Sequence, residues 1–172
     1  KEKGLKSDIS LDPSDRLGVI EWSTFLNNCK AQIGTEAGGD FFELDDRTRL
    51  KFIEYFKKHP DITIEETRDI FFKDYKNPVP MRIISGRNIE AAATGTRQIL
   101  FEGEYGGFLK PDEHYIALKK DFSNIEEVLS KFWDENYCRR VIDNARQLAL
   151  EQFTYEKLLE RFRCLLQATL GI

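Results

Sequence analysis

Hydrophobic positions recur every three or four residues over much of this chain, a period that predicts amphipathic helices. In the first such stretch, Trp22, Phe25, Leu26 and Cys29 fall on one face. Glycine and proline mark the boundaries between the stretches. The predicted helices lie at 21–30, twice within 46–75, around the three alanines 91–93, and at 123–132, 136–151 and 154–170.

Short apolar runs between these stretches predict strands at Ala31–Gly34, at Arg97–Phe101 and within 114–120. Strands that alternate with helices favour a parallel sheet covered on both faces. Doubly wound domains usually contain more strands than these. The fold class expected is therefore α/β, with a Rossmann-like partial parallel sheet, flanking helices and a helical C-terminal cap.

The domain organisation expected is a loose polar lead-in over residues 1–16 and one domain over residues 17–172. Within that domain, residues 43–80 read as a helical insertion that ends in a turn at "KNPVP". Two Ser/Thr-x-x-Glu patterns, Thr63 with Glu66 and Ser123 with Glu126, predict capping boxes at helix starts.

Composition narrows the function classes for this 172-residue chain. A net charge of −4, with no basic block, gives no electrostatic reason to expect nucleic acid or anionic lipid. The 3 cysteines are far apart, which suggests neither a disulfide framework nor a zinc cluster and favours a cytoplasmic location. No stretch is as long as a membrane span, and the start lacks both a signal-peptide core and an initiator Met, which hints at a fragment.

Two segments of the sequence are rich in glycine or carboxylate residues and lie where a predicted strand ends or a predicted helix begins. One group is the loop "GTEAGGD", Gly34–Asp40, and the other is Ser85–Glu90, which opens the alanine-rich helix. Ligands of parallel sheets collect at the carboxyl ends of the strands, and helix starts favour anions. We expect Glu90 in the first helical turn, where it either complements the helix dipole or accepts hydrogen bonds from ribose hydroxyls.

The segment "RNIEAAATGTRQILFEGEYGGFLKPDEHYIALKKDFSNIEEVL" resembles the C-terminal, nucleotide-sugar-binding part of GT-B glycosyltransferases, in particular the family 4-like group (glycosyl transferases group 1). Upstream, "VIEWSTFLNNCKAQIGTEAGGDFF" is similar to the group's helix, strand and Gly-rich acidic loop, and "FTYEKLLERF" to its C-terminal helix. The resemblance implies a glycosyltransferase with a nucleotide-activated sugar as its donor, no cofactor or obligatory metal, and retention of configuration.

The same resemblance assigns roles to individual residues. Glu90 would bind the ribose of the nucleotide sugar, and Glu36 would be the catalytic partner glutamate near the donor sugar. Arg87, at the start of the helix, would contact the diphosphate or else form a surface salt bridge. The backbone N–H groups that would approach the sugar or diphosphate belong to Ala37, Gly38 and Gly39, and Thr94 completes the donor-binding set.

Other carboxylates and histidines add little to this set. Glu102 and Glu104 would lie on the ligand side if the strand before them is parallel. His114 reads as a structural histidine, since no Cys or His lies near it in the sequence.

The chain also departs from the family pattern. A helical insertion separates Glu36 from Glu90, and the family's acceptor domain and first nucleotide-domain segment are absent. The acceptor is unknown, and we expect a missing N-terminal half, a partner chain or self-association to complete the site. The alternative is a non-catalytic protein-interaction module that docks through residues 43–80 and the last helix.

Overall fold

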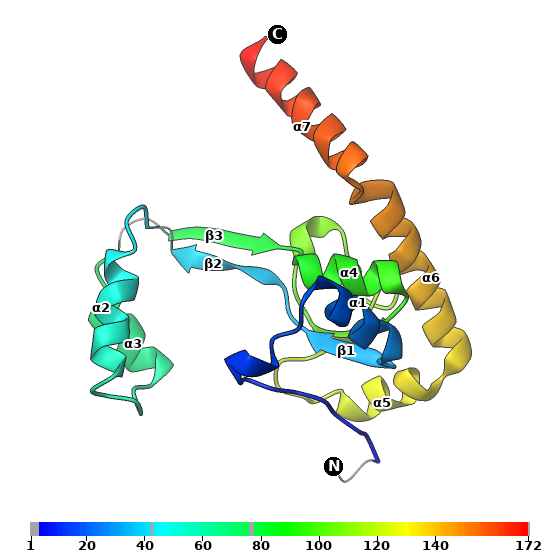
Figure 1. Cartoon of the computed structure of the whole chain (residues 1–172), viewed down its shortest axis with the longest axis horizontal. Coiled ribbons are helices and arrows are strands. Elements are labelled where there is room, and N and C mark those ends of the chain that lie inside the picture. Colours follow the sequence, from blue (N-terminus) through cyan, green and yellow to red (C-terminus); the bar gives the residue numbers. More distant parts are fainter. Residues whose placement is uncertain (1–3, 42, 76–77, 172) are drawn as a thin grey trace.

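The computed structural model describes residues 4–41, 43–75 and 78–171 and shows an α/β fold around a parallel sheet (Figure 1). The sheet contains three strands in the order β1 (Ala31–Gly34), β4 (Arg97–Phe101) and β5 (Ile116–Leu118). Both pairings are parallel, and Leu100 of the central strand lies between Gly34 and Ala117. The predicted fold class is confirmed, and β1 and β4 have the predicted bounds.

Helices cover both faces of this sheet. Successive side chains of β4 point to opposite faces, and each face packs against a helix. Ile99 and Phe101 pack with α5 (Ile125–Trp133), whereas Gln98 faces α4 (Gly86–Thr94). The long helix α6 (Glu135–Gln152) contacts α4, α5 and β4, and α1 (Val19–Asn28) lies against α4. The first core cluster consists of Ile116, Leu118, Val128, Phe132 and Cys138.

The α4–α6 contact depends on small side chains. Ala92 of α4 packs against Ala145 and Ala149 of α6, and all three are buried. Alanine allows the two helices to approach closely while it favours helix formation. The helix then ends at Gly95, whose φ of 73° is the left-handed C-cap conformation that glycine adopts without strain. The glycine stop expected from the sequence is thus confirmed.

A two-stranded antiparallel arm, β2 (Ala37–Phe41) with β3 (Pro78–Ile83), leaves the body of the molecule after β1. The prediction of a loop over Gly34–Asp40 is therefore wrong from Ala37 onward. The prediction of a turn at "KNPVP" is also wrong for Pro78–Pro80, while 76–77 lie outside the described residues. Gly38 permits the pairing, since a Cβ atom there would lie 1.9 Å from the carbonyl oxygen of Met81.

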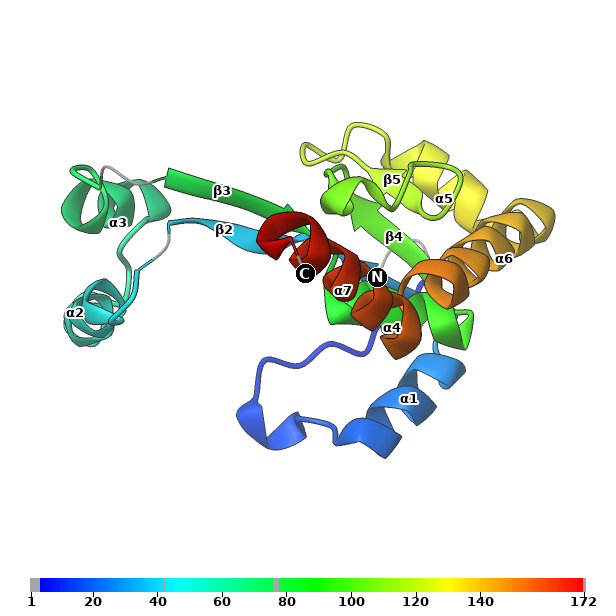
Figure 2. The same ribbon diagram turned by 90° about the horizontal axis from the view of Figure 1, so that it is seen from above.

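The arm carries a two-helix unit at its tip, residues 43–75, which we call the knob (Figure 2). Its helices are α2 (Arg47–Phe56) and α3 (Ile64–Phe71). Thr63 and Glu66 form the predicted capping box at the start of α3. The second predicted capping box is wrong, because α5 begins after Asn124, whose side chain instead bonds to Lys119 N and Ala117 O.

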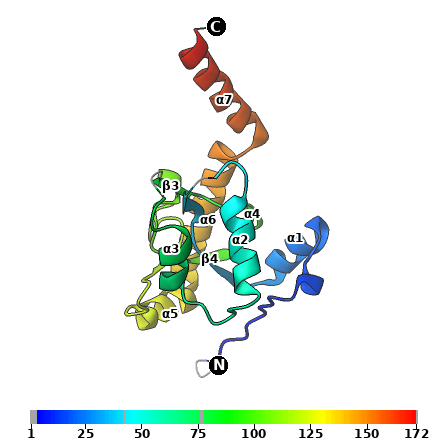
Figure 3. The same cartoon turned by 90° about the vertical axis from the view of Figure 1, so that its left-hand side faces the viewer.

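The two ends of the chain lie outside this core. The lead-in contains one turn of 3-10 helix, η1 (Pro13–Asp15), capped by Asp12. The last helix, α7 (Tyr155–Leu170), extends away from the sheet and buries none of its residues (Figure 3). Across the parts of the chain that the structure describes, no helix has the length and apolar character needed to cross a membrane.

The peripheral position of the knob leads to a test. Replacing residues Leu44–Asp74 by a short Gly-Ser bridge is expected to leave cooperative unfolding of the body intact, because the body's core clusters contain no knob residue and loop length changes closure entropy only slowly. Urea unfolding followed by circular dichroism measures this. A broad, non-cooperative transition would show instead that the knob is needed for the core.

Candidate active site

The carboxylate of Glu36 lies directly after β1, next to the carboxyl end of β4. It accepts hydrogen bonds from the backbone N–H groups of Glu104 at 2.9 Å and Tyr105 at 3.3 Å. The Glu36 side chain is only 15% exposed. Glu36 therefore connects the end of one parallel strand to the loop that leaves its neighbour, the edge at which ligands of such sheets bind.

The loop that Glu36 holds has an unusual backbone. Tyr105, Gly106 and Gly107, which form the short 3-10 helix η2, all have positive φ values. A non-glycine residue in that region is strained and needs support from its surroundings. Tyr105 has that support, since its buried side chain donates a 2.6 Å hydrogen bond to the carbonyl oxygen of Phe101. A Cβ atom on Gly103 would lie 2.9 Å from the Glu36 carboxyl carbon, so a larger residue there would displace the carboxylate.

A shallow depression of about 200 Å³ opens beside this carboxylate. Its lining residues are Glu36, Ala37, Gly38, Gly39 and Arg82. The structure thus brings four of the predicted site residues together. It adds Arg82 of β3, whose guanidinium Nε lies 3.8 Å from Glu36 Oε1. Arg82 was not among the predicted site residues, because "KNPVP" was read as a turn and no strand was predicted over 78–83; the alternation in "MRII" was the available signal.

Glu90 and Arg87 lie on α4, against α1 rather than in this depression. Glu90 is the fifth residue of α4, so the prediction that it lies in the first turn is wrong. Its carboxylate accepts a 2.7 Å hydrogen bond from Trp22 Nε1. The guanidinium of Arg87 lies 5.9 Å from the centre of the Trp22 ring. Both side chains are exposed, and Glu90 keeps a second carboxylate oxygen.

Thr94 lies one turn beyond Glu90 and is separated from Arg87 and from the depression beside Glu36. It is the last residue of α4, about 10 Å along the helix from Arg87 at a rise of about 1.5 Å per residue. Its hydroxyl hydrogen-bonds to the carbonyl oxygen of Glu90 at 3.0 Å and lies 3.0 Å from Thr96 Oγ1. The arrangement gives Thr94 a helix-ending role, far from the start of α4.

A buried polar network fixes the start of α4 over the sheet. Ser85 caps the helix, and its N–H and hydroxyl both donate to Asn88 Oδ1, at 3.1 and 2.6 Å. Asn88 Nδ2 and Gln32 Nε2 both donate to Gln98 Oε1, which links α4 to β4 and β1. Asn88 and Gln98 are each 2% exposed. None of these residues was predicted to form a network, because they are scattered along the chain.

Glu102 and Glu104 follow β4, and the parallel pairing of β4 places them at the ligand edge, as expected. Both side chains are exposed. Burial, and then the neighbouring carboxylates of Glu102 and Glu36, raises the pKa of Tyr115 to about 12, so its hydroxyl stays neutral. This edge carries three glutamates and one arginine, so it can accept hydrogen bonds from sugar hydroxyls and offers one cationic group to a phosphate.

A second depression, of about 390 Å³, lies between the segment Gly107–His114 and the C-terminal half of α6. His114 is 7% exposed, and its Nδ1 accepts the backbone N–H of Lys110 at 3.1 Å. Burial lowers the pKa of His114, although Glu113 opposes the shift. A neutral imidazole that is held by the backbone agrees with the structural role expected for it.

Comparison with known proteins gives no family for this chain. No protein-family model matches the sequence, and neither does any of the curated proteins.

Proposed function

We propose that this chain is the donor-side, nucleotide-sugar-binding portion of a GT-B-like glycosyltransferase. It would transfer a sugar from a nucleotide-activated donor to an acceptor that the missing half of the enzyme or a partner chain binds. The observation that carries the proposal is the meeting of Glu36, the Gly103–Tyr105 backbone and Arg82 around one depression at the carboxyl edge of β1 and β4.

The proposed roles follow from the chemistry of these groups. Glu36, with Glu102 and Glu104 beside it, would accept hydrogen bonds from hydroxyls of the donor sugar. Arg82 and the N–H groups at the start of α4 would stabilise negative charge that develops on the diphosphate as the glycosidic bond breaks. Arg87 is the second residue of α4 and Glu90 the fifth, and Glu90 would bind the ribose through the carboxylate oxygen that does not accept from Trp22.

Calorimetric titration of the chain with a panel of nucleotide diphosphate sugars tests the proposal. We expect weak but saturable binding, and Glu90→Gln should weaken it by about 1.5–3 kcal/mol, the loss typical of a hydrogen bond to a charged group. Glu113→Gln, which alters an exposed carboxylate at the second depression, is the matched control and should bind as the parent does. Equal affinity in a folded Glu90→Gln variant would reject the assignment of Glu90.

One observation favours the alternative of a non-catalytic interaction module. The knob displays apolar side chains on helices that bury none of their own residues. Titration separates the two functions, because an interaction module would remain silent at millimolar nucleotide sugar.

A further inference from the structure

The two helices of the knob carry opposite charges. Residues 47–58, which include α2, hold five basic residues and one acidic residue. Residues 61–74, which include α3, hold five acidic residues and two basic residues. The basic set is Arg47, Arg49, Lys51, Lys57 and Lys58 against Glu54; the acidic set is Asp61, Glu65, Glu66, Asp69 and Asp74 against Arg68 and Lys73. Asp45 and Asp46, which precede α2, form ion pairs with Arg47 and Arg49, so the basic surplus of α2 lies with Lys51, Lys57 and Lys58, on the helix next to the acidic α3.

Helix α2 has apolar side chains on two faces, and only one of them is used within the knob. Phe52 and Tyr55 pack edge-on against Phe71 of α3, with ring centres 5.8 and 5.6 Å apart. Next to this face lie Leu50, Ile53 and Phe56, which are 54%, 38% and 44% exposed, and the Phe56 ring also lies 5.7 Å from that of Phe52. Residues three apart along a helix are neighbours, so these three side chains form a continuous stripe.

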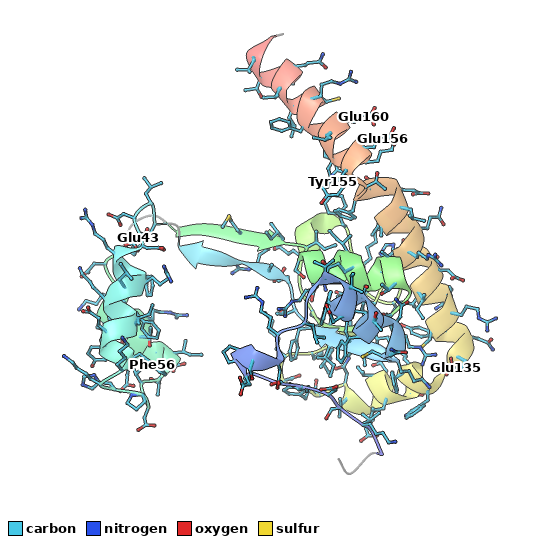
Figure 4. The ribbon with its side chains drawn as sticks, viewed as in Figure 1. Glu43, Phe56, Glu135, Tyr155, Glu156 and Glu160 are labelled. Carbon is cyan, nitrogen blue, oxygen red and sulfur yellow. The ribbon has the colours of Figure 1, made fainter. Side chains whose placement is uncertain are left out.

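No other described part of the chain covers this stripe. The hydrogen bonds, ion pairs and ring contacts described for α2 and α3 all join residues within the knob. Figure 4 shows Phe56 and its neighbours standing apart from the side chains around the sheet. A helix with an apolar stripe normally buries it against another element, and two helices alone cannot cover both faces of α2.

We infer that the occupant of this stripe is the knob of a second copy of this chain, and that two knobs associate as a four-helix bundle. A two-fold axis between them places each basic α2 beside the acidic α3 of the partner. Such an interface is isologous, so every favourable contact occurs twice. The Leu50–Phe56 stripe and Ile70 of α3, which is 51% exposed, form the apolar centre, as in other four-helix bundles.

The charge pattern is what selects a second copy over an unrelated partner. An unrelated partner could bind this surface with charge of one sign only. A second copy instead presents both signs, a basic α2 and an acidic α3, in the complementary arrangement. Alternative pairings that set α2 beside α2 would oppose like charges and are disfavoured. The inference does not depend on nucleotide-sugar binding, and it applies equally to the interaction-module alternative.

Light scattering on the full chain after size exclusion tests the inference. The expected mass is twice the 20.1 kDa of one chain. Ile53→Glu, which puts a charge at the centre of the stripe, should return the mass to that of one chain. Leu159→Glu on α7 is the matched control, since Leu159 is also exposed, at 66%, and should leave the dimer intact. A monomeric parent chain, or loss of the dimer in Leu159→Glu alone, would overturn the inference.

Charge reversal gives a sharper test that a loss of folding cannot imitate. Lys51→Glu, Lys57→Glu and Lys58→Glu together leave residues 47–58 with two basic and four acidic residues, and Glu65→Lys, Asp69→Lys and Asp74→Lys together leave residues 61–74 with two acidic and five basic residues; each triple variant alone should be monomeric. Mixed together, the two variants should form a one-to-one heterodimer, because each altered helix then meets an opposite charge. Native mass spectrometry with different tags measures the heterodimer. Folded variants that dimerise alone, or fail to associate when mixed, would contradict the arrangement.

Discussion

Replacing Tyr105 by alanine is expected to lower the free energy of unfolding by about 3–5 kcal/mol, the range for truncating a buried aromatic side chain. Tyr105 has no exposed surface and packs with Leu100, Leu109 and Tyr115 in one core cluster. The variant loses that packing and also the hydrogen bond to Phe101 O. The measurement is urea unfolding at equilibrium, analysed with the same dependence of the unfolding free energy on urea concentration (m value) for parent and variant.

Tyr105→Phe separates the two contributions. It keeps the ring and removes only the hydroxyl, so we expect a loss of about 0.5–1.5 kcal/mol, the typical net value of one hydrogen bond. If Tyr105→Ala cost no more than Tyr105→Phe, the packing argument would fail. Since Tyr105 also supports the left-handed backbone of the loop held by Glu36, the alanine variant should weaken any nucleotide-sugar binding as well.

The parallel sheet could be predicted from the sequence because its signals are local. Ala31–Gly34 and Arg97–Phe101 are short apolar runs bounded by turn residues, and each directly follows a helix, α1 or α4. The arm had no such signal. Its strands pair across the whole knob, so no hairpin turn marks them, and β2 begins with Ala37, Gly38 and Gly39. Glycine normally weakens a strand. Here Gly38 is needed because the backbone of Met81 lies too close for a side chain, a contact that exists only in the folded arm.

The candidate site was also predictable only where its residues are contiguous in the sequence. Glu36 and the three residues after it lie together because they are contiguous, and the parallel pairing fixed the edge they occupy. Arg82 could not be found without β3. The position of Glu90 was misjudged because the helix starts at Gly86, which a Ser-x-x-Asn capping box determines, and its contact with Trp22 joins residues far apart in the sequence.

Replacing Glu36 by alanine is expected to cost about 2–4 kcal/mol of folding free energy, since it removes the acceptor of two backbone N–H groups and the carboxylate beside Arg82. The loss of stability should be greatest in the loop that Glu36 holds. The amides of Glu104 and Tyr105 should exchange with solvent faster, while those of β1 remain protected. Hydrogen exchange followed by mass spectrometry measures the local effect, and urea unfolding measures the total.

Glu104→Gln is the matched control for this variant. Its side chain is exposed in the same loop and its backbone N–H still donates to Glu36, so we expect a change within about 0.5 kcal/mol. Glu36→Gln should fall between the two, because an amide oxygen in the place of Oε2 still accepts both N–H groups, whereas the neutral amide nitrogen replaces Oε1 beside the Arg82 guanidinium. Unchanged stability and exchange in Glu36→Ala would show that the loop holds its left-handed backbone without this carboxylate. Glu36 would then be free to act on a ligand alone, whereas the expected loss means that the group proposed to bind the donor sugar also builds the loop around it.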